Sequence, residues 1–89
     1  MRILVTPSFT RRAKRLHPNE KKSLDKAIRA VSANTRVGEE KVGDLAGIFI
    51  YKFAIGNERW LLAYRVVSKK KITLLLFGPH ENFYRELKK

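Results

Sequence analysis

The stretch IFIYKFAIGNERWLLAYRVV, residues 48–67, decides the fold. Gly56 and Asn57 separate two runs of apolar and aromatic residues, which is typical of a two-residue β-hairpin loop. If these two residues form the loop, counting outward pairs Ile55 with Glu58. The segment therefore predicts two long antiparallel strands with a defined register.

Side chains alternate between the two faces of this hairpin, so its residues divide into two sets. One set is almost wholly aromatic and aliphatic and is predicted to pack on helices: Phe49, Tyr51, Phe53, Trp60, Leu62, Tyr64 and Val66. The other set is half apolar and carries three cations and no acid: Ile48, Ile50, Lys52, Arg59, Leu61 and Arg65. We expect this second face to suit an RNA strand, with cations on phosphates and apolar groups against bases. The alternative is an outer face on which lysine and arginine stems cover aliphatic neighbours.

The segments before the hairpin predict a strand and two helices. Residues 2–6 favour a strand because they are β-branched and aliphatic and contain no breaker. Thr6-Pro7 begins a helix that ends at His17-Pro18, since the residue before a proline avoids helical geometry. Pro18 begins the second helix. Its predicted buried stripe consists of Leu24, Ala27, Ile28 and Val31.

The remaining segments complete an α+β domain. Residues 33–47 hold three glycines among charged residues and indicate a loop. After a turn at residues 68–71, an apolar strand ends at Gly78-Pro79, and residues 80–87 predict about two turns of helix. The predicted fold has an N-terminal strand, a helical hairpin, then antiparallel strands with a short C-terminal helix, in the order β-α-α-β-β-β-α. Its length makes residues 1–89 a single domain.

Charge is the strongest global feature. Lysine and arginine total 20 against 8 acidic residues, a net charge of +12. Such a field attracts polyanions, so RNA or DNA is the expected partner; the alternative is a basic surface that is merely solvated. There is no cysteine, and no apolar run approaches the ~20 residues that span a bilayer. We therefore expect a cytoplasmic protein that does not contact membranes.

His80 directly follows the predicted last strand, and Tyr84 lies four residues later. Residues at this spacing share one side of a helix. Two interpretations stay open: either His80 begins the helix and Tyr84 belongs to the rim of the core, or both act on a substrate. The other histidine, His17, lies in a turn before Pro18 and is interpreted as structural.

Three segments resemble the RelE/ParE superfamily of bacterial toxins from type II toxin–antitoxin modules: VGDLAGIFIYKFAI (42–55), ERWLLAYRVV (58–67) and LLLFGPHENFYREL (74–87). The last is similar to the endings of ribosome-dependent mRNA interferases of the YafQ and RelE branches, where a strand runs into a G-x-H-x-x-x-Y-like tail. The resemblance covers nearly the whole chain. It implies a toxin whose cationic concave face enters the ribosomal A site and cleaves mRNA.

The resemblance also implies a cognate antitoxin that wraps the toxin and blocks that face. Charge complementarity predicts that the binding segment of the antitoxin is acidic. We expect a hetero-oligomer of toxin and antitoxin, and a toxin that is monomeric on its own.

Cleavage of RNA through its own 2′-hydroxyl requires proton transfer and charge neutralisation at the phosphate, so no metal or cofactor is expected. We predict His80 as general acid or base, because an ordinary histidine pKa of about 6.5 suits that work. Lys52 and Arg65 are predicted to hold the phosphate, and Tyr84 to stack on a base or orient the phosphate. Arg59 is a candidate for the same clamp and is assigned to RNA binding.

The run Lys69, Lys70 and Lys71 at the predicted turn is assigned to RNA binding, with a solvated turn as the alternative. Glu58 and Glu81 are further candidates for a general base. YafQ-like relatives place additional histidines and an acid near the central hairpin, and this chain has Gly56-Asn57-Glu58 there. A scheme with paired histidines is therefore not supported.

Two other functions remain open. A ParE-like toxin would inhibit DNA gyrase by binding it, without cleaving anything, and a non-catalytic domain would only bind RNA. His80 argues against a pure binder, which has no need of a titrating group in the tail.

Overall fold

The structure, a computed structural model, describes residues 1–88. Its elements follow the predicted order with two short additions, β2 and the 3₁₀ turn η1. Their bounds are β1 (Arg2–Val5), α1 (Pro7–Ala13), α2 (Pro18–Ala33), β2 (Glu39–Glu40), η1 (Gly43–Leu45), β3 (Ile48–Ile55), β4 (Glu58–Ser68), β5 (Lys71–Pro79) and α3 (Phe83–Leu87). None of the helices in the described part of the chain has the length and hydrophobicity needed to cross a bilayer.

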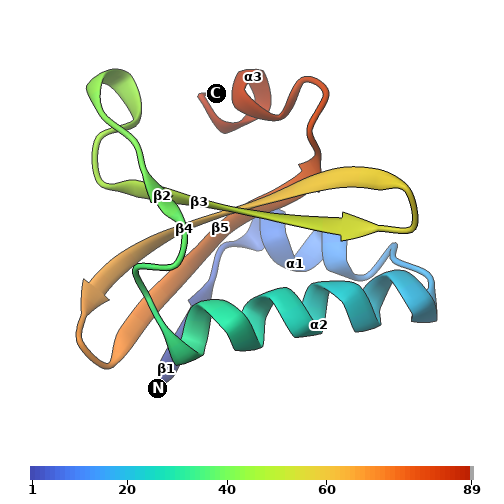
Figure 1. Cartoon of the computed structure of the whole chain (residues 1–89), viewed down its shortest axis with the longest axis horizontal. Coiled ribbons are helices and arrows are strands. Elements are labelled where there is room, and N and C mark those ends of the chain that lie inside the picture. The colour runs from blue at the N-terminus through green and yellow to red at the C-terminus, as the bar shows by residue number, and fades with distance from the viewer. Residues whose placement is uncertain (89) are drawn as a thin grey trace.

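The five strands form one sheet in the order β1-β5-β4-β3-β2 (Figure 1). β1 runs parallel to β5, and the other neighbours are antiparallel. The predicted hairpin register is confirmed, because Ile55 pairs with Glu58 and Phe53 with Trp60. Gly56 has a φ of 61°, the left-handed geometry that a tight hairpin turn requires and that glycine adopts without strain. The sequence did not predict β2, which adds two residues to the edge beside β3.

Local sequence signals set the starts of α1 and α2. The Thr6 hydroxyl accepts a 3.1 Å hydrogen bond from the Phe9 N–H, so Thr6 caps α1 with proline at its first position. At the start of α2, the His17 N–H donates to Glu20 Oε1 at 2.8 Å. These bonds satisfy backbone groups that a helix end leaves without partners, and they confirm both predicted helix starts.

The two helices cover one face of the sheet, where the main core forms (Figure 1). Phe9 of α1 and the predicted stripe of α2 pack on the aromatic set of the hairpin. The buried members of this core are Phe9, Leu24, Ala27, Val31, Phe49, Trp60, Leu62, Tyr64, Ile72, Leu74 and Phe77. Each fully buried large side chain contributes roughly 1.5–3 kcal/mol of transfer free energy, so this face dominates stability.

α3 lies on the opposite side of the sheet from α1 and α2 (Figure 1). That face carries a second apolar cluster, which includes Phe83 of α3. Phe83 is fully buried there against the sheet, and Leu87 packs beside it, which confirms both as anchors. Ile50 is 2% exposed and Leu61 is 0% exposed. The expectation that the apolar groups of this face contact RNA bases was therefore wrong, because the C-terminal helix covers them. Of the six residues in this set, the three cations Lys52, Arg59 and Arg65 are exposed and the three apolar residues are buried.

The C-terminal helix is shorter than predicted. It begins at Phe83 instead of His80, and residues 80–82 form a turn. Asn82 has a φ of 64°, a left-handed conformation that breaks the helical path and that asparagine tolerates better than most residues. His80 is consequently not a helix cap, since the N-cap position belongs to Asn82.

Candidate functional site

His80 lies at the end of β5, on the α3 side of the sheet. Its backbone N–H donates a 2.9 Å hydrogen bond to the carbonyl of Arg59 in β4, one position beyond the Trp60–Pro79 pair. The side chain is exposed. Its ring meets the ring of Tyr84 edge-on, with centroids 6.4 Å apart and an interplanar angle of 86°. The predicted proximity of His80 and Tyr84 therefore exists, although a turn creates it and not a shared helix face.

Tyr84 is half-buried, between the second cluster and a cation. Its ring packs on Phe83, with centroids 5.7 Å apart, and the ammonium of Lys41 lies 5.5 Å from its centroid. That distance is within the range of a cation–π contact. Tyr84 is thus partly a rim residue of the core and partly a surface residue beside His80.

Lys41 is a cation that the sequence did not single out. It follows β2, and its backbone N–H donates to the carbonyl of Ile48 at 2.9 Å. Its ammonium bonds to Glu39, which raises the pKa of Lys41. The same bond, with a smaller contribution from Lys52, lowers the pKa of the Glu39 carboxyl. Only the β2–β3 pairing reveals this placement, and a two-residue strand leaves no recognisable sequence pattern.

Lys52 and Arg59 lie on adjacent strands near the hairpin turn. Lys52 pairs with Leu61 and Arg59 with Ala54, so the two cations are two positions apart on one face. Both are exposed, and both line a shallow hollow of about 370 Å³ beside Gly56. The backbone carbonyl of Arg59 also accepts the hydrogen bond from the His80 N–H. Lys52, Arg59 and His80 therefore lie at the same end of the sheet.

Arg65 lies at the other end of the same strand. It pairs with Ile48 and Thr73, six residues along β4 from Arg59. At 3.3 Å per residue the two arginines are about 20 Å apart. Arg65 lines a separate hollow of about 260 Å³ together with Glu86 and Leu87. The structure therefore brings Arg59 to His80, and it does not bring Arg65 there.

The three lysines of the predicted turn are also distant from His80. Lys69 and Lys70 form the β4–β5 turn, and Lys71 begins β5 (Figure 1). His80 follows the last residue of β5, so nine residue steps of extended chain, about 30 Å, separate it from Lys71. Lys69 and Lys70 are exposed. The lysine run belongs to the opposite end of the sheet from the His80 turn.

The two acidic candidates differ in their surroundings. Glu58 accepts a 2.8 Å hydrogen bond from the indole N–H of Trp60, so its carboxylate is engaged by a residue of the helix-covered face. Glu81 directly follows His80 and is exposed. Of the two, Glu81 is the one that lies beside the histidine in the chain and in the turn.

The arrangement at this end of the sheet joins three kinds of group. His80 offers a ring that can exchange a proton, Arg59 and Lys52 offer fixed positive charge, and Tyr84 offers a phenol with Lys41 over its ring. A planar guanidinium matches the oxygens of a phosphate, and an imidazole suits proton transfer near neutral pH. We name this set, His80, Tyr84, Arg59, Lys52 and Lys41, the His80 site.

Known structures share this fold. A chain of the intact E. coli RelBE toxin–antitoxin complex superposes with a TM-score of 0.72 and 16% identity, covering 90% of this chain and 96% of that chain. The isolated E. coli RelE toxin gives 0.70 and 15%, covering 98% and 95%. The archaeal RelE–RelB complex from Pyrococcus horikoshii gives 0.54 and 16%, covering 90% and 94%. At such identities the likeness establishes the fold alone.

The family follows from the sequence itself. No curated protein sequence matches this chain significantly. The sequence model of a family described as "ParE-like toxin of type II bacterial toxin-antitoxin system" matches residues 3–88. Because that match spans nearly the whole chain, the protein belongs to the ParE-like toxins of type II bacterial toxin–antitoxin systems, within the RelE/ParE superfamily.

Proposed function

We propose that this toxin is a ribosome-dependent mRNA endonuclease that cleaves RNA through its 2′-hydroxyl without a metal and so inhibits translation. The observation that carries the proposal is the His80 site. An exposed imidazole lies beside Tyr84 and is held by its own backbone next to Arg59. That combination supplies a proton-transfer group and a phosphate clamp within one small surface.

His80 is the proposed general acid or base. The reaction removes a proton from the 2′-hydroxyl, which attacks the phosphate, and returns a proton to the departing 5′-oxygen. A positioned proton-transfer group contributes on the order of 10²–10⁴-fold to such a step. Tyr84 lies at the edge of the imidazole and orients the phosphate or stacks on a base.

Arg59 takes the clamping role that the sequence assigned to Arg65. The reason is position, since Arg59 adjoins His80 and Arg65 lies about 20 Å along the strand. Lys52 adds a positive charge from the neighbouring strand β3. Lys41, whose ammonium lies over the ring of Tyr84, adds another. These cations offset the charge that builds on the phosphate oxygens.

We further propose that a cognate antitoxin neutralises the protein. The family is one of toxin–antitoxin systems, and two of the structurally similar proteins are toxin–antitoxin complexes. A net charge of +12 favours an acidic binding segment in that partner.

A second candidate function follows from the family match itself. The matching family is described as ParE-like, and a ParE-like toxin would bind DNA gyrase and cleave nothing. Under this reading the cations matter and the imidazole of His80 does not. The two functions therefore differ in what a single substitution at His80 does.

The deciding experiment compares wild type, His80→Ala and His17→Ala in mRNA cleavage with and without translating ribosomes. His17 is the matched control, because it is the other histidine, is also exposed and lies at the start of α2. Ribosome-dependent cuts that disappear only in His80→Ala support the endonuclease. Inhibition of supercoiling by gyrase, undiminished in His80→Ala and with no RNA cleavage, would establish the alternative.

A further inference from the structure

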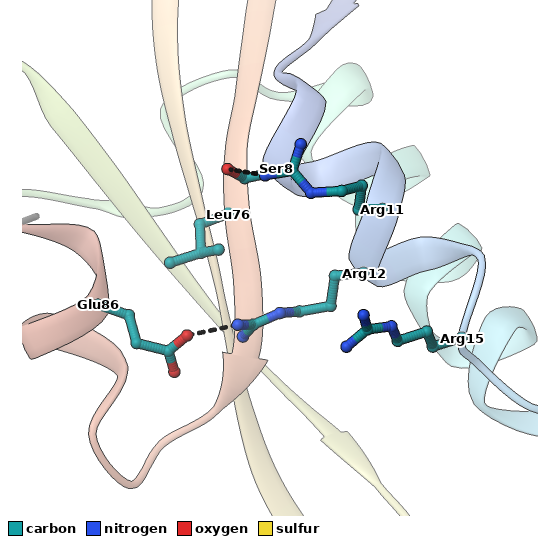
Figure 2. A pocket seen from close by; sticks show the side chains of 6 residues that line it. All are labelled: Ser8, Arg11, Arg12, Arg15, Leu76 and Glu86. Carbon is teal, nitrogen blue, oxygen red and sulfur yellow. Dashed lines mark hydrogen bonds and ion pairs between the residues drawn. The ribbon is translucent and has the colours of Figure 1, made fainter.

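A second basic surface lies away from the His80 site, between α1 and α3. Figure 2 shows Arg12 reaching from α1 toward Glu86 of α3, with Arg11 and Arg15 on either side of it along the chain. These residues, with Ser8 and Leu76, line a hollow of about 360 Å³. We name it the arginine groove.

One arginine of the groove is structural. Arg12 forms an ion pair with Glu86 and donates to the carbonyl of Phe77 at 3.1 Å. Its guanidinium lies close to Gly78, where an added Cβ would come within 2.6 Å of Nη1. Arg12 therefore joins α1 to the end of β5 and to α3. It pairs with Glu86, the carboxylate that lines the groove.

The other two arginines remain available. Arg11 donates to the hydroxyl of Ser8 at 3.3 Å, and within residues 1–88 no acidic side chain pairs with Arg11 or Arg15. Both are exposed. Arg15 lies in the turn after α1, where its backbone N–H donates a hydrogen bond to the carbonyl of Arg12. Arg11 and Arg15 are therefore about one helical turn apart.

The groove continues to Arg65. The hollow that Arg65 lines shares Ser8, Leu76 and Glu86 with the arginine groove. Arg65, which the structure separates from His80, is thus the far member of a row of cations that runs along the α1 side of α3. The sequence contained no sign of this row, because its members come from α1 and β4.

We propose that the arginine groove, extended by Arg65, binds the phosphate backbone of RNA as a second, sequence-independent contact outside the His80 site. The row carries an excess of positive charge, since among residues 1–88 the two hollows are lined by four arginines and one carboxylate, Glu86, which Arg12 engages. Guanidinium groups bind phosphate oxygens in a bidentate way. Among residues 1–88 no aromatic side chain lines either hollow, so we expect no base to stack there and only the backbone to be held.

RNA suits this groove better than a peptide segment does. Peptide segments that bind grooves rely on apolar anchors placed in pockets. Among residues 1–88, Leu76 is the one apolar residue that lines the arginine groove itself, and the further apolar residues Ile48, Leu75 and Leu87 line only the hollow beside Arg65. The proposal rests on the proposed function in one respect, which is that RNA is the polyanion the protein meets.

The test is direct binding of a fluorescein-labelled RNA oligonucleotide whose 2′-hydroxyls are all methylated, so that cleavage plays no part. Fluorescence anisotropy gives Kd across a series of salt concentrations for wild type, Arg11→Gln/Arg15→Gln and Arg29→Gln/Arg36→Gln. The second pair is the matched control, because it removes the same charge from exposed arginines of α2 and the loop after it. Thermal melting by circular dichroism verifies that all three proteins fold.

We expect Arg11→Gln/Arg15→Gln to bind about tenfold more weakly near 0.1 M salt, and its slope of log K against log salt to be shallower by about 1.4, the value for two lost phosphate contacts on a single strand. The control pair keeps the wild-type slope. Arg65→Gln weakens binding in the same direction.

Equal losses in both double variants would show a general effect of net charge and overturn the proposal, as would no loss in either. Displacement of the RNA by polyglutamate, with the same dependence on Arg11 and Arg15, would assign the groove to an acidic protein segment instead. The binding pattern expected above, in a protein that cleaves no mRNA, supports the groove and contradicts the proposed endonuclease.

Discussion

The backbone N–H of His80 lies 2.9 Å from the carbonyl oxygen of Arg59 and donates a hydrogen bond to it. This bond continues the β4–β5 ladder by one position, so the sheet itself holds the histidine beside that arginine. Of the two arginines that β4 places on the α3 side, Arg59 is the neighbour of His80. The hydrogen bond from His80 therefore distinguishes Arg59 from Arg65, although the sequence pattern places both arginines on the same face.

Replacement of Arg59 is expected to reduce the rate of cleavage more than replacement of Arg65. Loss of one group that stabilises developing charge costs roughly 10²–10³-fold in kcat. Single-turnover cleavage on saturating ribosomes should therefore fall about 100-fold in Arg59→Ala. In Arg65→Ala the same rate should stay within about threefold of wild type, while a higher toxin concentration is needed to reach it.

Arg65→Ala is the control for Arg59→Ala, because both substitutions remove an exposed arginine from β4. A larger loss of the single-turnover rate in Arg65→Ala than in Arg59→Ala would contradict the assignment. Arg65 would then hold the phosphate, as predicted from the sequence.

The hairpin was the predictable part of this fold. Gly56-Asn57 sets the register locally, and strand alternation then assigns every side chain of β3 and β4 to a face. The cover over the second face was not predictable from the same pattern. It depends on five residues of α3, redirected by Asn82, whose docking on Leu61 is a contact between distant parts of the chain.

The same distinction holds for the candidate site. His80 and Tyr84 are close in sequence, so their proximity could be predicted from spacing. Lys41 reaches Tyr84 only because β2 pairs with β3, and the row of cations from α1 to Arg65 exists only after the sheet and α3 have packed. Sites assembled by tertiary packing leave no local sequence signal, whereas sites built on one turn do.

Tyr64→Phe is expected to destabilise the protein by about 1–2 kcal/mol. The Tyr64 hydroxyl accepts a 3.0 Å bond from the Gly38 N–H and donates a 2.8 Å bond to the Thr35 carbonyl, and its ring is fully buried. The substitution leaves both backbone groups without their partner. Thermal unfolding should show a Tm lower by about 4–8 °C for each kcal/mol.

Tyr51→Phe is the control for this effect, since Tyr51 is also a core-facing tyrosine but is only half-buried. It should unfold close to the wild-type temperature. A Tyr51→Phe protein as unstable as Tyr64→Phe would show that the two bonds of Tyr64 contribute little.

Tyr64 should also make stability depend on alkaline pH. Burial raises the pKa of its phenol above the ordinary value of 10.0. The unfolded chain therefore releases the proton first, and stability is fully present below pH 10 and falls as pH rises from there through the folded pKa. Denaturant unfolding at a series of pH values should show a steeper alkaline loss for wild type than for Tyr64→Phe. Parallel curves for the two proteins would contradict this linkage.

Lys69→Gln/Lys70→Gln should weaken the association of the toxin with ribosomes and leave the rate of cleavage at saturation unchanged. These lysines occupy the β4–β5 turn, about 30 Å from His80 along β5, and at physiological ionic strength charges are screened over about 8 Å. They can hold RNA only outside the His80 site.

The measurement for Lys69→Gln/Lys70→Gln is single-turnover cleavage over a range of ribosome concentrations at two salt concentrations, with Lys52→Gln as the comparison. The lysine pair should raise the half-saturating concentration and reduce its salt dependence, whereas Lys52→Gln lowers the maximum rate. A lower maximum rate in Lys69→Gln/Lys70→Gln, in a protein with the wild-type Tm, would place the β4–β5 turn within reach of the scissile phosphate and contradict the separation of the two ends of the sheet.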